Sequence, residues 1–130
     1  MRCERKLWLS IHRSDLAEST PLGRQRAIET GIRVGLLART NFVGTLVDEK
    51  DANRVVAESK RLFDYGSTIF EAGFAAGGVY VRVDIMEPGK RGWIVSEVKS
   101  TTRRKSIHIA DASIQRYVLE LAGVGIEAVR

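Results

Sequence analysis

Residues 79–86 read VYVRVDIM, with Val or Ile at every odd position, and this stretch decides the fold. Strict alternation is typical of a β-strand with one buried and one polar face. Residues 68–75, TIFEAGFA, come just before it, and the dipeptide Gly77-Gly78 between the two stretches predicts a β-hairpin. After the turn EPGKRG, residues 93–99 read WIVSEVK and complete an antiparallel meander of three strands.

Helical patterns lie on both sides of this meander. One short helix is predicted over residues 3–13, and a second begins at Thr20-Pro21, because Thr is a favoured N-cap and Pro suits the first helical position. The second helix ends near Asn41, and its Gly31 and Gly35 would let another backbone approach closely. A third helix is predicted from Asp51 to Leu62.

A fourth helix is predicted over residues 107–122, followed by a last strand over 126–129. The apolar spacing of this helix predicts a buried side formed by Ile107, Ala110, Ile114, Tyr117, Val118 and Leu121. The order αβββαβ predicts an α/β fold, in which a mixed sheet with an antiparallel three-stranded meander is flanked by helices. We expect one domain over 1–130, mainly helical over 1–65 and carrying the site over 66–130.

The composition limits the classes of function. Of 130 residues, 21 are Lys or Arg and 16 are Asp or Glu, and the net charge of +5 favours a polyanion as partner. The chain contains no apolar run long enough to span a membrane and no pattern of a secretory signal. Its single cysteine, Cys3, excludes an internal disulfide framework. We therefore expect a cytoplasmic protein without a membrane partner.

Two carboxylates could meet on the meander. Alternation sends Asp84 to the face opposite Val81 and Ile85, and it places Glu97 and Lys99 on one face of the third strand. Neighbouring strands can hold Asp84 beside Glu97, where the two charges repel unless a cation separates them. Mg²⁺ or Mn²⁺ suits such oxygen ligands, and a nearby lysine can orient a water. These parts suffice for metal-dependent phosphodiester hydrolysis.

The same residues carry a resemblance to a known family. Asp84, then Glu97-Val98-Lys99 on the next strand, then Gln115 and Tyr117 on the following helix, resemble the PD-(D/E)XK nuclease superfamily. The similarity is greatest to its RecB-like branch, which includes CRISPR-associated exonucleases. The resemblance implies a restriction-endonuclease-like core, hydrolysis of DNA by an exonuclease-type mechanism, and a role in DNA repair or defence.

The resemblance covers residues 66–130 well, and the segment CERKLWL at 3–9 more loosely. It implies that the metal ion is held by Asp84, Glu97, the main-chain carbonyl of Val98 and Glu71. Lys99 would then be the catalytic lysine, and Gln115 would point toward the edge of the active site.

Three positions depart from the family pattern. The branch often has a histidine four residues after a glycine on the helix before the sheet, where this chain has Gly35, so that ligand is absent or replaced by Glu29. Tyr117 follows Gln115 by two residues instead of four. Cys3 matches one iron–sulfur ligand, but no iron–sulfur cluster can form within a chain that has no other cysteine. We expect a truncated or minimal version of a longer nuclease domain.

The basic run Arg103-Arg104-Lys105 follows directly after the predicted catalytic strand. With Tyr117, it is predicted to contact nucleic acid, mainly through phosphates. Alternative readings stay open: these charges could be a solvated loop, and the acidic pair a solvated strand face. A catalytically silent nucleic-acid-binding module and an enzyme acting on another phosphoester are the competing functions. A homodimer or a partner subunit is also compatible with the sequence.

Overall fold

The computed structural model describes residues 3–16 and 21–130. The chain forms two compact units, and the boundary between them in the sequence lies between Thr30 and Gly31. The first unit contains helix α1 (Glu4–His12) and the short 3-10 helix η1 (Ser14–Leu16). Helix α2 (Leu22–Arg39) begins in the first unit and ends in the second. The predicted N-cap Thr20 lies outside the described residues. Both predicted N-terminal helices are present.

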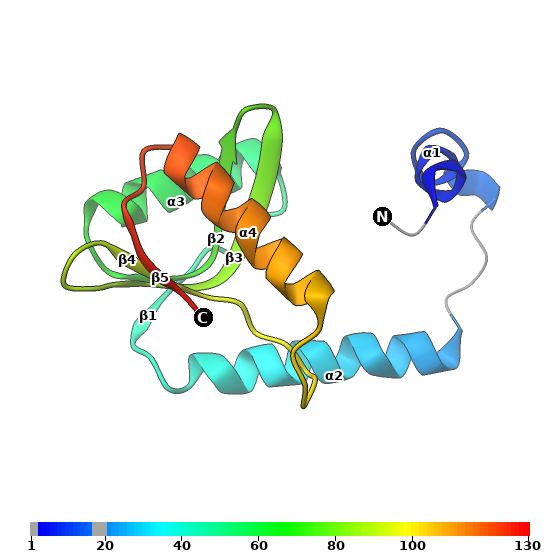
Figure 1. The fold of residues 1–130 in the computed structure, drawn as a ribbon, viewed down its shortest axis with the longest axis horizontal. Coiled ribbons are helices and arrows are strands. Elements are labelled where there is room, and N and C mark those ends of the chain that lie inside the picture. Colours follow the sequence, from blue (N-terminus) through cyan, green and yellow to red (C-terminus); the bar gives the residue numbers. More distant parts are fainter. Residues whose placement is uncertain (1–2, 17–20) are drawn as a thin grey trace. The chain divides into compact units, whose positions relative to one another are not determined.

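The second unit is built on one mixed sheet of five strands in the order β1-β2-β3-β4-β5 (Figure 1). The strands are β1 (Gly44–Leu46), β2 (Thr68–Ala76), β3 (Val79–Pro88), β4 (Trp93–Ser96) and β5 (Ile126–Val129). Strands β2, β3 and β4 form the predicted antiparallel meander, whereas β1 runs parallel to β2 and β5 parallel to β4. The α/β class, with helices flanking a mixed sheet, is confirmed.

The hairpin between β2 and β3 turns at Gly77 and Gly78, whose φ angles are 58° and 75°. Two successive positive φ angles are what a two-residue turn needs in order to match the twist of its strands. The glycine pair therefore fixes the register in which Val81, Val83 and Ile85 are buried and the residues between them are only partly buried.

Helix α3 (Ala52–Asp64) packs against β2. Asp51 caps it by accepting a hydrogen bond from the Arg54 N–H, and Val55, Ser59 and Leu62 form its buried stripe. A Cβ on Gly73 of β2 would lie 2.4 Å from Val55 Cγ1, so the helix approaches the strand at a point where only glycine fits. This close approach ties the helix to the centre of the sheet.

Helix α4 (Ser106–Leu121) contacts β2, β3 and β5, and its buried residues are Gln115, Val118 and Leu119. The predicted buried side was wrong except at Val118, because five of its members are exposed: Ile107, Ala110, Ile114, Tyr117 and Leu121. The physical reason is the rotation of the helix, which turns the polar Gln115 inward to reach groups on the sheet. The apolar stripe therefore faces away from the core.

The structure differs from the sequence predictions in two smaller points and adds one strand. Strand β4 ends at Ser96, three residues before the predicted end, although the Glu97 N–H still donates to the Arg130 carbonyl. Strand β1 was not predicted, since three residues are too few to show a period. No atom of the described residues comes within 4 Å of a Cβ built on Gly31 or Gly35, so the expected close backbone contact is absent.

Among the described residues, none of the helices is both long and apolar enough to cross a lipid bilayer. The core of the second unit joins residues from α3, α4 and the sheet, and Trp93 stacks on Phe63 with ring centroids 4.9 Å apart. This core supports the end of β4, where the candidate site begins.

Candidate functional site

Strand register brings three acidic residues into one row across the sheet. The β2–β3 pairs on either side of Glu71 place it opposite Asp84. The β3–β4 register, continued one residue beyond Ser96, places Glu97 opposite Asp84 on the other side. Directly opposite residues on antiparallel strands share a face of the sheet. The predicted neighbourhood of Asp84 and Glu97 is therefore present, with Glu71 next in the row.

Asp84 is partly buried at the centre of this row, and its pKa is raised to about 6. Burial is the largest cause, and the charges of Glu97 and Glu71 raise the pKa further. The Val98 N–H donates to Asp84 Oδ2 at 2.7 Å, which acts in the opposite direction, as does the charge of Lys99. The carboxylate is thus ionised at neutral pH at an energetic cost that a nearby cation would offset.

Lys99 lies beside Glu97, as the spacing of the motif predicts. Its Nζ is 2.6 Å from Glu97 Oε1 and 3.5 Å from Asp111 Oδ2. Burial lowers the pKa of Lys99, but the hydrogen bonds and charges of the two carboxylates together raise the pKa above its ordinary value. The ammonium therefore stays charged at neutral pH. Sequence reasoning missed Asp111, although it lies four residues before Gln115 and hence on the same helix face.

Gln115 reaches the site from α4. Its side-chain Nε2 donates to Glu97 Oε2 at 2.6 Å and to the Arg82 carbonyl at 3.2 Å. Its Oε1 is buried and has no hydrogen-bond partner within the described part of the chain. A buried amide oxygen without a donor is costly, and the two hydrogen bonds of Nε2 offset part of that cost.

Glu71 is paired with two guanidinium groups, whereas Glu97 is paired with the single ammonium of Lys99. Arg39 Nη2 binds Oε1 of Glu71, and Arg82 Nε lies 3.2 Å from its Oε2. Its φ angle is +58°, which lies in the left-handed region of backbone conformation that residues other than glycine rarely adopt. Sequence reasoning did not find either arginine as its partner, because Arg39 lies 32 residues away in the chain and belongs to another element.

Val98 lies against Asp84 through its N–H, and its carbonyl as a metal ligand stays a prediction. Glu29, the candidate replacement for the missing histidine, is an exposed residue of α2. Within residues 3–16 and 21–130, no three His, Cys, Asp or Glu side chains are grouped so that they could hold a metal ion. The Mg²⁺ or Mn²⁺ ion at Asp84 and Glu97 stays a prediction.

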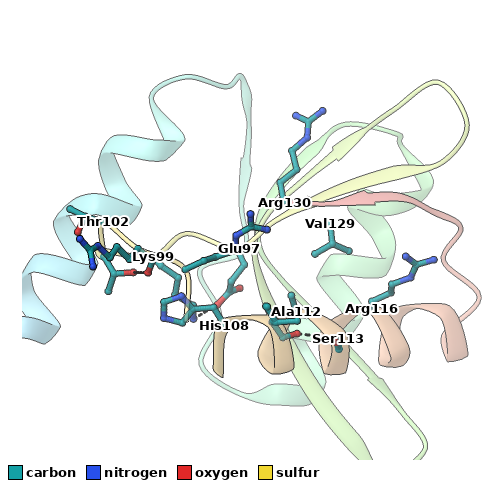
Figure 2. A pocket seen from close by; sticks show the side chains of 13 residues that line it. Glu97, Lys99, Thr102, His108, Ala112, Ser113, Arg116, Val129 and Arg130 are labelled. Atoms are coloured by element: carbon teal, nitrogen blue, oxygen red, sulfur yellow. Dashed lines mark hydrogen bonds and ion pairs between the residues drawn. The ribbon is translucent and has the colours of Figure 1, made fainter. Parts of the chain in front are cut away.

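A pocket of about 550 Å³ adjoins this site and includes Glu97 and Lys99 in its wall (Figure 2). Arg103 and Arg104 of the predicted DNA-binding loop also line it, whereas Lys105 stands outside as the N-cap of α4. Tyr117 is 60% exposed and does not line the pocket. Tyr117 follows Gln115 by two residues, about 200° around the helix, so the structure does not bring it to the site.

The arrangement places Asp84 opposite Glu97, with the Lys99 ammonium beside Glu97 and a basic loop along the adjoining pocket. A scan against protein-family models and searches of curated proteins and of solved structures found no match to this chain.

Proposed function

We propose that this protein is a metal-dependent nuclease that hydrolyses DNA phosphodiester bonds and has the PD-(D/E)XK architecture. One observation carries the proposal: Asp84 lies opposite Glu97, and Lys99 Nζ lies 2.6 Å from Glu97 Oε1. The resemblance implies an acidic pair with an adjacent lysine, and these residues come from strand β3 and from the segment that follows β4, its neighbour in the sheet.

The topology supports the proposal. A helix precedes an antiparallel meander, a second helix follows it, and the last strand pairs in parallel with the third strand of the meander. That order fits the αβββαβ core of restriction-endonuclease-like proteins. Strand β1 would then be an addition at the edge of the sheet beside β2.

The donor set fits a hard divalent cation. Two carboxylates that repel each other gain from a shared Mg²⁺. When bound, the ion would polarise a phosphate oxygen and lower the pKa of a coordinated water. Asp84 and Glu97 would hold it, with the Val98 carbonyl as a further oxygen.

The remaining residues have roles of their own. Lys99 stays protonated beside Glu97, so it can orient the attacking water and offset the charge that develops on the phosphate. Gln115 fixes the carboxylate of Glu97 through a 2.6 Å hydrogen bond. Arg103 and Arg104 extend the positive charge along the pocket and would hold the phosphates of the strand.

A catalytically silent nucleic-acid-binding module is the second candidate, and one observation favours it. Glu71 is paired with Arg39 and Arg82, so two guanidinium groups occupy the acid that would complete a three-carboxylate metal site. A scaffold with this pairing would keep its fold and its basic pocket while binding metal weakly.

The test compares wild-type protein with Lys99→Ala, using Lys60→Ala on the exposed side of α3 as the matched control. Single- and double-stranded DNA, RNA and simple phosphoesters are offered with Mg²⁺, with Mn²⁺ or with a chelator. We expect metal-dependent DNA cleavage that Lys99→Ala lowers by about 100-fold or more, whereas Lys60→Ala cleaves normally. DNA binding without cleavage in all three proteins would establish the silent module. Cleavage of simple phosphoesters alone would instead indicate an enzyme that acts on another phosphoester.

A further inference from the structure

The pocket beside Glu97 and Lys99 carries more positive charge than one scissile phosphate requires. Five cationic side chains line it, against the single carboxylate of Glu97: Lys99, Arg103, Arg104, Arg116 and Arg130. They come from the loop after β4, from α4 and from the residue that follows β5, so three parts of the chain contribute cationic residues to the lining. Small-molecule sites commonly combine a few polar groups from several elements in this way.

Most of these cations are available to a ligand. Arg103 and Arg104 form no ion pair with any residue that the structure describes. Arg116 pairs with Glu120 one turn along α4, but both side chains are about half exposed, and such pairs exchange readily. Arg130 Nη1 lies 3.7 Å from Glu87 and is largely exposed. An anion entering the pocket would therefore displace only weak interactions.

The size and lining of the pocket fit one nucleotide. Its volume of about 550 Å³ lies within the range of small-molecule sites. Hydroxyl groups of Thr101, Thr102 and Ser113 line it with the arginines, and Ile109 and Ala112 give it an apolar side. The pocket thus offers charge for a phosphate, hydrogen bonds for a sugar and apolar contact for a base.

The charge favours one kind of phosphate over another. A terminal phosphate monoester carries about −1.5 to −2 at neutral pH, whereas each internal diester carries a single negative charge. Guanidinium groups that line one pocket favour the phosphate with the higher charge, and each can bind a phosphate through two parallel hydrogen bonds. A pocket that only tracked a continuous backbone would gain little from concentrating its cations.

We propose that this pocket binds the phosphorylated end of a nucleic-acid strand and so directs the enzyme to strand ends. The inference rests on the proposed nuclease function and adds the substrate class to it. The shared ligand chemistry is a terminal phosphate monoester on a polynucleotide, which a 5′ or a 3′ end can supply.

The test is a binding measurement in the presence of a chelator, so that no cleavage occurs. Oligonucleotides of one sequence carry a 5′-phosphate, a 3′-phosphate or no terminal phosphate, with a fluorescent label inside the strand. We expect wild-type protein to bind one phosphorylated form about tenfold more tightly than the unphosphorylated form, and the preferred form identifies the end. Arg116→Gln should reduce this ratio toward one.

Arg61→Gln is the matched control, because Arg61 is also an exposed helix arginine paired with a glutamate on its own helix, Glu58. It should keep the full preference. Equal affinity of wild-type protein for all three oligonucleotides would overturn the proposal, as would an equal loss in both variants. The binding assay contains no divalent ion, so its result does not depend on nuclease activity. Metal-dependent cleavage by a protein that shows no preference for phosphorylated ends would overturn the end-binding proposal and leave the nuclease proposal intact.

Discussion

Helices α2 and α3 are both predicted by their periodicity, but they differ in how much they bury among the described residues. None of the 18 residues of α2 is buried, whereas α3 buries Val55, Ser59 and Leu62 in 13 residues. The glycines differ in the same way: Gly31 and Gly35 of α2 face open space, while Gly73 of β2 receives α3 at close range. Periodicity therefore predicts that a helix forms, whereas the close packing of α3 also depends on Gly73 in another element.

The largest test of this comparison replaces one leucine in each helix. Leu62→Ala should lower the free energy of unfolding by about 3 kcal/mol, because Leu62 is 5% exposed and its loss leaves a cavity. Leu36→Ala on α2 should change it by less than about 0.5 kcal/mol, since Leu36 is 54% exposed. Urea unfolding followed by circular dichroism measures both, and equal effects would show that α2 is packed in solution.

A smaller effect separates two serines that share one local hydrogen bond. Ser59 and Ser113 each donate to the carbonyl four residues earlier, but only Ser59 also accepts the Gly73 N–H, at 2.8 Å. Ser59→Ala would leave that buried N–H without a partner and should cost about 1–3 kcal/mol. Ser113→Ala on the exposed side of α4 should cost little. A similar loss in both variants in thermal unfolding would refute the role of the Ser59–Gly73 bond.

The buried residues of α3 stabilise the fold, whereas ionised Asp84 in the row of three acids destabilises it at neutral pH. The pKa of Asp84 is about 6 in the folded protein against an ordinary value of 3.8, so folding binds a proton and stability falls as pH rises from about 4 to 6. Asp84→Asn should remove this fall, which we expect to be about 1–2 kcal/mol after solvent screening. Unfolding curves at pH 4 and pH 7.5 measure it.

Divalent metal provides the complementary check on Asp84. If the acidic pair binds Mg²⁺, the ion should raise the Tm of wild-type protein at pH 7.5, and the effect should disappear below about pH 6 as Asp84 is protonated. Asp84→Asn should show no rise at either pH. An equal rise of Tm in both proteins would place the metal elsewhere.

The smallest expected effect concerns Asp111, which acts through Lys99. Asp111→Asn removes one of the charges that raise the pKa of Lys99, so the alkaline limb of the activity profile should move to lower pH. On the proposed nuclease function, we expect kcat at pH 7.5 to fall only a few-fold. A pH–rate profile that keeps its alkaline limb would show that Asp111 does not position the lysine.

Local periodicity was enough to predict the meander, the helices around it and the opposition of Asp84 and Glu97. An alternation of two residues fixes both the strand and the face of each side chain, so the acidic pair follows from the register. The predicted buried side of α4 was wrong. Its apolar stripe and the side that carries Gln115 cannot both face the sheet, and the hydrogen bonds of Gln115 to the sheet favour the second. Long-range partners such as Arg39 leave no local signal in the sequence.

The left-handed backbone at Glu71 has a consequence for any substitution there. Glycine would relax the main chain, but it would also leave two guanidinium groups without their counter-charge beside Asp84. Glu71→Gly and Glu71→Gln therefore separate the two contributions: the first changes both conformation and charge, and the second changes charge alone. Glu71 therefore keeps a strained backbone conformation in β2, and its carboxylate supplies the counter-charge of Arg39 and Arg82.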